Sequence, residues 1–234
     1  MTGPRALSLL LALSSVGFAM VAGCNSLTGA DGLQIADGNA GGGGGGGTGG
    51  ETTTTTPPVQ CTYPTTGFST MVGGVMPNHS WQGFVNESME ATEVTMADYL
   101  DCDGSKGINA LLIDVSATWC GSCQVEAQTL TNKMKQKWDA LGIRVLTLMI
   151  QDAQSNPATI DTALAWKTEY NLISTTVAAD PQFFFQQLAP NGSVGLPFLI
   201  TIDPRTMTLV STAEGYPADE QGLLDLAAKN QQAQ

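Results

Sequence analysis

Basic residues and histidine are scarce in this chain of 234 residues. It has 9 Lys and Arg against 21 Asp and Glu, a net charge of −12 at pH 7, and one histidine, His79. Binding to nucleic-acid phosphates requires clustered Lys and Arg, so the composition argues against a nucleic-acid partner. Aromatic residues reach only 6%, which is typical of a soluble domain rather than a membrane bundle.

Cysteine is also scarce, and its number is odd. The five cysteines are Cys24, Cys61, Cys102, Cys120 and Cys123. An odd number of thiols in an exported protein indicates a free thiol or a separate use for one of them. The position of each cysteine therefore indicates its use.

The N-terminus has the features of an export signal. Arg5 is the only charge before Asp31, and residues 6–20 form an apolar run. The run ends in Val21-Ala22-Gly23-Cys24, which resembles the lipobox of bacterial lipoproteins. A plain membrane anchor or an ordinary secretory signal is the alternative interpretation, although the run is short and contains serine and glycine.

The lipobox resemblance implies that residues 1–23 are removed as a signal peptide and that Cys24 carries the lipid. Two or three acyl chains anchor a protein to a membrane far more firmly than one. We therefore expect a lipid-anchored protein of the cell envelope that faces the periplasm. Asn25 follows the lipidated cysteine, where Asp would mark inner-membrane retention in enterobacteria, and this favours the outer membrane.

Residues 24–60 are predicted to form a disordered tether. They contain the runs Gly41–Gly47 and Thr52–Thr56, followed by Pro57-Pro58, and almost no apolar periodicity. Such a segment cannot bury enough apolar surface to offset the entropy of ordering. A flexible coil of this length reaches about 35 Å, so we expect it to hold the following domain away from the membrane.

Residues 61–234 are predicted to form one α/β domain. The apolar pattern predicts strands at 110–116, 143–150, 198–202 and 209–214, and helices at 121–141, 157–170, 181–188 and 218–229. Pro157 suits the first turn of its helix. This order predicts a mixed central sheet with helices on both faces.

The segment Trp119-Cys120-Gly121-Ser122-Cys123 lies between a predicted strand and a predicted helix. At a helix N-terminus, free N–H groups and the helix dipole favour the thiolate of Cys120 and lower its pKa. Cys123 lies one turn further on, where it can attack a mixed disulfide formed by Cys120. The spacing therefore predicts a pair that cycles between dithiol and disulfide.

A Cys-x-x-Cys pair has other known uses. Half of a zinc site would need a second pair or a histidine cluster, and neither is present. Haem attachment would need His after the second cysteine, where Gln124 stands. A purely structural disulfide stays open. We expect no metal and no cofactor.

Residues 111–123 resemble the active-site strand and turn of the thioredoxin superfamily, particularly its membrane-tethered thiol–disulfide oxidoreductases. The resemblance implies a thioredoxin-like fold, with Asp114 as a buried acid that exchanges a proton with Cys123. It also identifies Leu196-Pro197 as the family's cis-proline loop, whose backbone pairs with substrate, and it places Trp119 at the substrate face. Asp114 could instead be an acid at a strand edge, paired with a neighbour.

The sequence departs from the thioredoxin pattern at two positions. Ser122 stands where thioredoxin has proline, which leaves the redox potential open. Gln128 stands where a kinking proline is usual, which predicts a straighter helix. Glu126 matches a glutamate of the tethered subgroup, or it is a residue of the helix face.

Cys61 and Cys102 remain, and in an oxidising compartment they are expected to form a structural disulfide. It would close a loop of 41 residues and stabilise the fold by about 4 kcal/mol in the chain-entropy model.

The sequence thus predicts a lipid-anchored thiol–disulfide oxidoreductase that acts on exported proteins with thiols or disulfides. The alternatives are a thioredoxin-fold binding module with a structural disulfide and a thiol peroxidase, although the peroxiredoxin pattern around Cys120 is absent. The sequence identifies neither the electron donor nor the direction of electron flow.

Overall fold

The computed structural model describes residues 61–69, 71–188 and 193–233, which belong to one compact unit, Thr55–Gln234. The predicted signal peptide, the lipid acceptor Cys24 and the tether lie outside these described residues. Among the helices described, none has the length and apolar character needed to cross a bilayer.

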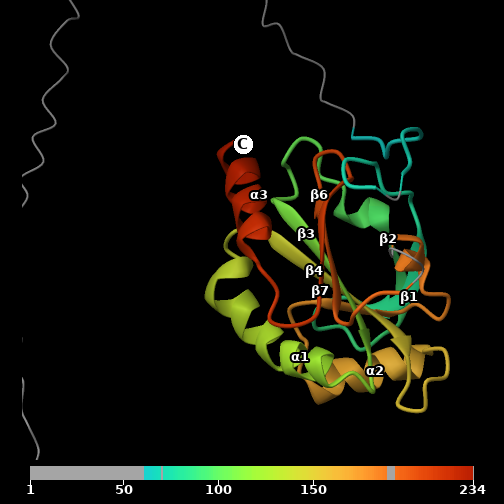
Figure 1. Ribbon diagram of the computed structural model, residues 1–234. Helices are drawn as coiled ribbons and strands as arrows, with labels where there is room; N and C mark the ends of the chain where they lie inside the picture. Colours follow the sequence, from blue (N-terminus) through green and yellow to red (C-terminus); the bar gives the residue numbers. More distant parts are fainter. Residues whose placement is uncertain (1–60, 70, 189–192, 234) are drawn as a thin grey trace, which may run out of the picture. The chain divides into compact units, whose positions relative to one another are not determined.

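A mixed sheet organises the domain (Figure 1). In the described part of the chain the sheet has seven strands in the order β2-β1-β5-β4-β3-β6-β7. β3 pairs in parallel with β4 and antiparallel with β6. The strands are β1 (Ser80–Phe84), β2 (Thr92–Thr95), β3 (Ala110–Ala117), β4 (Ile143–Gln151), β5 (Thr176–Ala179), β6 (Phe198–Asp203) and β7 (Thr208–Glu214).

The central strand β3 ends directly before the candidate site. All eight of its residues are buried, which requires cover on both faces and explains its nearly unbroken apolar run. The α-helices of the described residues are α1 (Gly121–Lys133), α2 (Ile160–Glu169) and α3 (Gln221–Gln232). α1 begins just beyond the carboxyl end of β3, and Lys133 at its end pairs with Glu220 before α3, so these helices are neighbours (Figure 1).

The helix predicted over 121–141 is not one uniform α-helix. α-Helical hydrogen bonding ends at Lys133, and a π-helical turn follows over Met134–Trp138. The Asp139 N–H donates to the Met134 carbonyl at 3.1 Å, and Met134 and Trp138 are both buried. The wider turn thus allows both apolar side chains to face the core. The helical region ends at Gly142, whose φ of +71° suits glycine.

Two other helix predictions were also inaccurate. α2 begins at Ile160 with Thr159 as its N-cap, because Pro157 forms a β-bridge with Gln151 instead of entering the helix. The predicted helix 181–188 is reduced to a short 3₁₀-helix, η3 (Phe184–Leu188).

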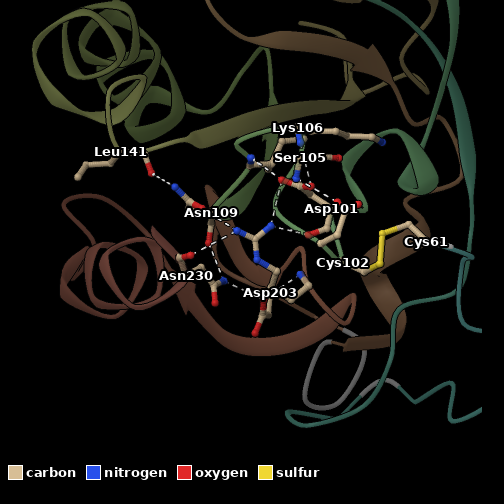
Figure 2. Close-up of polar contacts among 12 residues, drawn as sticks. Cys61, Asp101, Cys102, Ser105, Lys106, Asn109, Leu141, Asp203 and Asn230 are labelled. Atoms are coloured by element: carbon tan, nitrogen blue, oxygen red, sulfur yellow. Dashed lines mark hydrogen bonds and ion pairs between the residues drawn. A yellow bond between two sulfur atoms is a disulfide. The ribbon is translucent and has the colours of Figure 1, made fainter. Parts of the chain in front are cut away.

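A buried polar network joins distant parts of the chain (Figure 2). The Arg205 guanidinium, from the turn between β6 and β7, lies 3.0 Å from the Asp101 carboxylate and donates to Asn109 Oδ1 at 3.0 Å. It also donates to the backbone carbonyl of Asn230 in α3 at 3.3 Å. Asp101 is buried and accepts backbone N–H bonds within its own loop, so both charges are compensated.

The disulfide expected between Cys61 and Cys102 lies beside this network (Figure 2). It joins the first described residue to the residue after Asp101, with 5.6 Å between the two Cα atoms. The segment that follows Cys61 then reaches the edge of the sheet. There, residues 73–76 exchange backbone hydrogen bonds with Met207 and Leu209, at the start of β7.

Candidate functional site

The disulfide between Cys120 and Cys123 marks the candidate site at the N-terminus of α1. Cys120 is the N-cap, and its Sγ accepts the Cys123 backbone N–H at 3.1 Å. Cys120 is 5% exposed and Cys123 is 1% exposed. A thiolate formed at Cys120 would therefore receive a backbone hydrogen bond and the favourable end of the helix dipole.

A cleft of about 570 Å³ opens beside Cys120. Its walls come from residues 119–122, the end of β4, residues 181–183, and the loop that contains Val194 and Leu196. Among the described residues that line it, none is charged. The described lining of the cleft is thus uncharged, and it brings Cys120 and this loop together.

That loop contains the predicted Leu196–Pro197 pair, and the peptide bond between them is cis. The Ser122 hydroxyl donates to the Leu196 carbonyl at 2.9 Å, which joins α1 to the loop. On the other side, Gly195 N–H donates to the Glu214 carboxylate and Gly215 N–H donates to the Pro197 carbonyl, both at 2.9 Å. Contacts from α1 and from the end of β7 therefore fix the loop next to Cys120.

Trp119 lies at the mouth of the cleft with 49% of its surface exposed. Its indole N–H donates to the side-chain oxygen of Gln151 at 2.9 Å. The Gln151 backbone carbonyl accepts the N–H of Thr118 at 3.1 Å. Gln151 thus orients the exposed ring, a role that the sequence did not suggest because the residue only ends a strand.

Asp114 is a buried acid on β3, with 1% of its surface exposed. Burial raises its pKa to about 6, although hydrogen bonds from Ser116 Oγ at 2.7 Å and Thr147 Oγ1 at 3.1 Å act in the opposite direction. These two donors stabilise the carboxylate form.

Glu126 is a second buried acid, on α1 one turn beyond Cys123. It is 2% exposed, and its Oε2 is buried with no hydrogen-bond partner. Burial and then the charge of Asp114 raise its pKa to about 9, while the Lys133 ammonium lowers it. Because Asp114 has two donors and the Glu126 Oε2 has none, Glu126 holds the proton when the pair carries one negative charge.

These two acids predict a pH-dependent stability. Both bind protons more tightly in the folded chain than in the unfolded chain, so the free energy of unfolding is highest below the unfolded pKa values, near 4. It should fall as the pH rises from about 4 to about 9. We expect Glu126→Gln to remove much of this slope, since glutamine stays neutral, as urea denaturation across that range would show. The exposed Glu90→Gln is the matched control and should keep the slope; an equal slope in the Glu126→Gln variant would contradict the prediction.

Metal-binding groups do not gather in the described residues. No cluster of three or more His, Cys, Asp or Glu side chains there could hold a metal ion. His79 instead stacks on Phe184, with ring centroids 4.1 Å apart.

Comparisons with known proteins identify similar folds. No family model and no curated protein sequence matches the chain. The crystal structure of a reduced 2-Cys peroxiredoxin from Plasmodium vivax matches with a TM-score of 0.52 at 15% identity, over 69% of this chain and 82% of that chain. Thioredoxin peroxidase I of Plasmodium yoelii matches with a TM-score of 0.50 at 16% identity, over 70% of this chain and 90% of that chain.

A protein described as a thiol:disulfide interchange protein DsbE, from Chlorobium tepidum, has a TM-score of 0.49 at 21% identity, over 69% of this chain and 99% of that chain. At such identities a likeness concerns the fold and not the activity. The likeness to the two peroxidase structures concerns the part of this chain that forms the mixed sheet and its helices. The chain therefore has a thioredoxin-like α/β fold, as its sequence predicts.

Proposed function

We propose that this protein is a thiol–disulfide oxidoreductase that exchanges disulfides with polypeptides. The observation that carries the proposal is the Cys120–Cys123 disulfide, which caps α1 and opens on an uncharged cleft beside the Leu196–Pro197 loop. A helix N-terminus favours the thiolate of Cys120 as the attacking group and as the leaving group. The adjacent backbone loop provides hydrogen-bonding groups for an extended polypeptide.

The proposed exchange has two steps. In the dithiol form, the Cys120 thiolate attacks a substrate disulfide, forms a mixed disulfide and releases one substrate thiolate. Cys123 then loses its proton and attacks Cys120, which forms the Cys120–Cys123 disulfide and releases the second substrate thiolate. The substrate gains two electrons and the protein loses two, and the reverse sequence oxidises a substrate dithiol.

We assign Asp114 as the group that accepts the Cys123 proton. Its support is its burial and its raised pKa, which bring it close to the range in which a carboxyl group exchanges protons at neutral pH. Trp119, exposed at the mouth of the cleft, would contact the substrate.

The proposed place of action is the cell envelope. The lipobox-like sequence ending at Cys24 supports a lipid anchor, and residues 25–60 would then space the domain from the outer membrane towards the periplasm. The substrates would be exported proteins with thiols or disulfides. The midpoint potential decides the direction, since about −120 mV indicates an oxidant and about −270 mV a reductant.

Trapping the intermediate tests the proposal. We expect reduced Cys123→Ser protein, mixed with insulin as a model disulfide protein, to form a covalent adduct that dithiothreitol releases. Removal of the resolving thiol leaves the mixed disulfide with no internal attack to break it. Mass spectrometry of peptides should locate the link at Cys120.

The matched control is the Cys120→Ser/Cys123→Ser double variant, which should form no adduct. If Cys123→Ser protein forms no adduct either, the disulfide is structural and the protein is a binding module. The rate at which hydrogen peroxide oxidises the reduced wild-type protein should also be compared with the rate for insulin. A much higher rate with hydrogen peroxide would instead support a thiol peroxidase.

A further inference from the structure

The Ser122 hydroxyl lies between two acceptors that have different roles in the proposed reaction. Ser122 is the second residue of α1 and is half-buried. Its Oγ is 2.9 Å from the Leu196 carbonyl oxygen and 3.3 Å from Cys120 Sγ. A hydroxyl has one proton, so it can donate fully to only one of these acceptors at a time.

In the disulfide form, the hydrogen bond from the Ser122 hydroxyl to the Leu196 carbonyl is favoured over one to Cys120. A neutral sulfur is a weak hydrogen-bond acceptor, whereas a backbone carbonyl is a strong one. The shorter distance also joins Oγ to the carbonyl. In the oxidised protein, Ser122 therefore takes one of the two lone pairs of the Leu196 carbonyl, and Leu196 lines the cleft.

In the dithiol form, the hydrogen bond from Ser122 to Cys120 becomes the stronger of the two. A Cys120 thiolate carries a full charge, and hydrogen bonds to charged acceptors are about twice as strong as neutral ones. Cys123 N–H already donates to the same sulfur at 3.1 Å, so a second donor would complete the stabilisation of the anion. Rotation of the hydroxyl about the Cβ–Oγ bond of Ser122 is enough to redirect its proton, because Oγ already lies near both acceptors.

We propose that Ser122 is a redox-responsive positioning residue, whose hydroxyl bonds the Leu196 carbonyl in the disulfide form and the Cys120 thiolate in the dithiol form. The inference rests on the proposed function, because it assigns the Leu196 carbonyl to polypeptide docking. No electrons move in this rotation. Reduction frees this lone pair of the carbonyl for a backbone N–H of an extended substrate, and oxidation returns it to Ser122, which weakens substrate binding and favours release of the product.

The Leu196 carbonyl can be observed directly. Leu196–Pro197 is the single Leu-Pro pair in the sequence, so labelling leucine carbonyls with ¹³C and proline with ¹⁵N isolates one coupled resonance. We expect this resonance to move upfield on reduction of the wild-type protein, as the carbonyl loses its hydrogen bond. In Ser122→Ala it should start near the upfield position, and most of the redox-dependent change should be lost.

Two further variants are controls, one at Ser122 itself and one at the other residue between the two cysteines. Ser122→Thr retains the hydroxyl and should retain the redox-dependent change. Gly121→Ala alters the neighbouring residue without a steric clash, since a Cβ there meets no atom within 4 Å, and it should also retain the change. Alkylation of Cys120 by iodoacetamide should need a higher pH in Ser122→Ala than in either control.

Binding provides the third measurement. A cysteine-free peptide, acetyl-Val-Ala-Ser-Val-Ala-amide, should bind the reduced wild-type protein roughly fivefold more tightly than the oxidised protein, the value of one net hydrogen bond. Ser122→Ala should bind it equally in both forms. An unchanged redox response of the Leu196 resonance in Ser122→Ala would overturn the inference, even if insulin exchange proceeds; a failure of insulin exchange with a normal resonance response would overturn only the proposed function.

Discussion

Replacement of Cys120 by serine should lower the rate of disulfide exchange with insulin by a factor of about 10³ or more, which is the scale of losing a catalytic nucleophile. Serine keeps the size of the side chain and can still accept the Cys123 backbone N–H, so α1 should retain its N-cap. What it lacks is an anion at neutral pH and a sulfur that can form the mixed disulfide. The measurement is the rate of insulin reduction by dithiothreitol with catalytic amounts of protein.

Two comparisons make this result specific. The Cys123→Ser variant should also lose turnover but retain the first attack, so it accumulates adduct where Cys120→Ser does not. Far-ultraviolet circular dichroism should show the same fold in both variants. A Cys120→Ser rate within a few-fold of the wild-type rate would show that another group is the nucleophile.

Loss of the Cys61–Cys102 disulfide should lower the free energy of unfolding by about 4 kcal/mol, from the entropy of a loop of this length. For a domain of this size the midpoint of thermal unfolding should fall by about 10 °C. The bond fixes the N-terminal segment beside the buried Asp101, so its loss frees that segment in the folded state as well. The measurement is urea and thermal unfolding of Cys61→Ala/Cys102→Ala protein.

The active-site disulfide must not contribute to this comparison. Both proteins should therefore carry Cys120→Ser and Cys123→Ser, so that they differ only at Cys61 and Cys102. Addition of dithiothreitol should destabilise the parent and leave the double alanine variant unchanged. A difference below about 1 kcal/mol would mean that polar contacts alone fix the loop, since an unstrained cross-link of this length is worth several times that amount.

Most of the strands that the sequence predicts correctly are long and buried, and burial gives them a continuous run of apolar residues. The sequence predicts β3, β4 and β6 because their apolar runs are continuous, and it predicts β7 because a turn signal at 203–206 follows β6. β1, β2 and β5 were missed, because each has only four or five residues and short strands show no clear period. The start of α2 was misplaced because the bridge between Pro157 and Gln151 is a tertiary contact.

The candidate site divides in the same way. Cys120, Cys123, Asp114 and the Leu196–Pro197 loop were selected because their residue types and spacing carry a signal. For Ser122 the sequence shows only a departure from the proline of thioredoxin. Its contact with Leu196 spans 74 residues, and no local pattern encodes such a contact. The sequence also does not predict that Glu126 Oε2 lacks a hydrogen-bond partner, because this depends on how the side chains pack in the core.

The pairing of residues 73–76 with the start of β7 has a consequence for the solubility of the protein. Exposed backbone N–H and C=O groups on an edge strand can pair with another copy and start aggregation. Here the N-terminal segment covers those groups, and the Cys61–Cys102 bond and the Tyr63 hydroxyl, which donates to the Met76 carbonyl at 2.7 Å, hold the segment in place. Under reducing conditions hydrogen bonds alone would hold this segment, so the backbone groups at the edge of β7 would be exposed more often than in the oxidised protein.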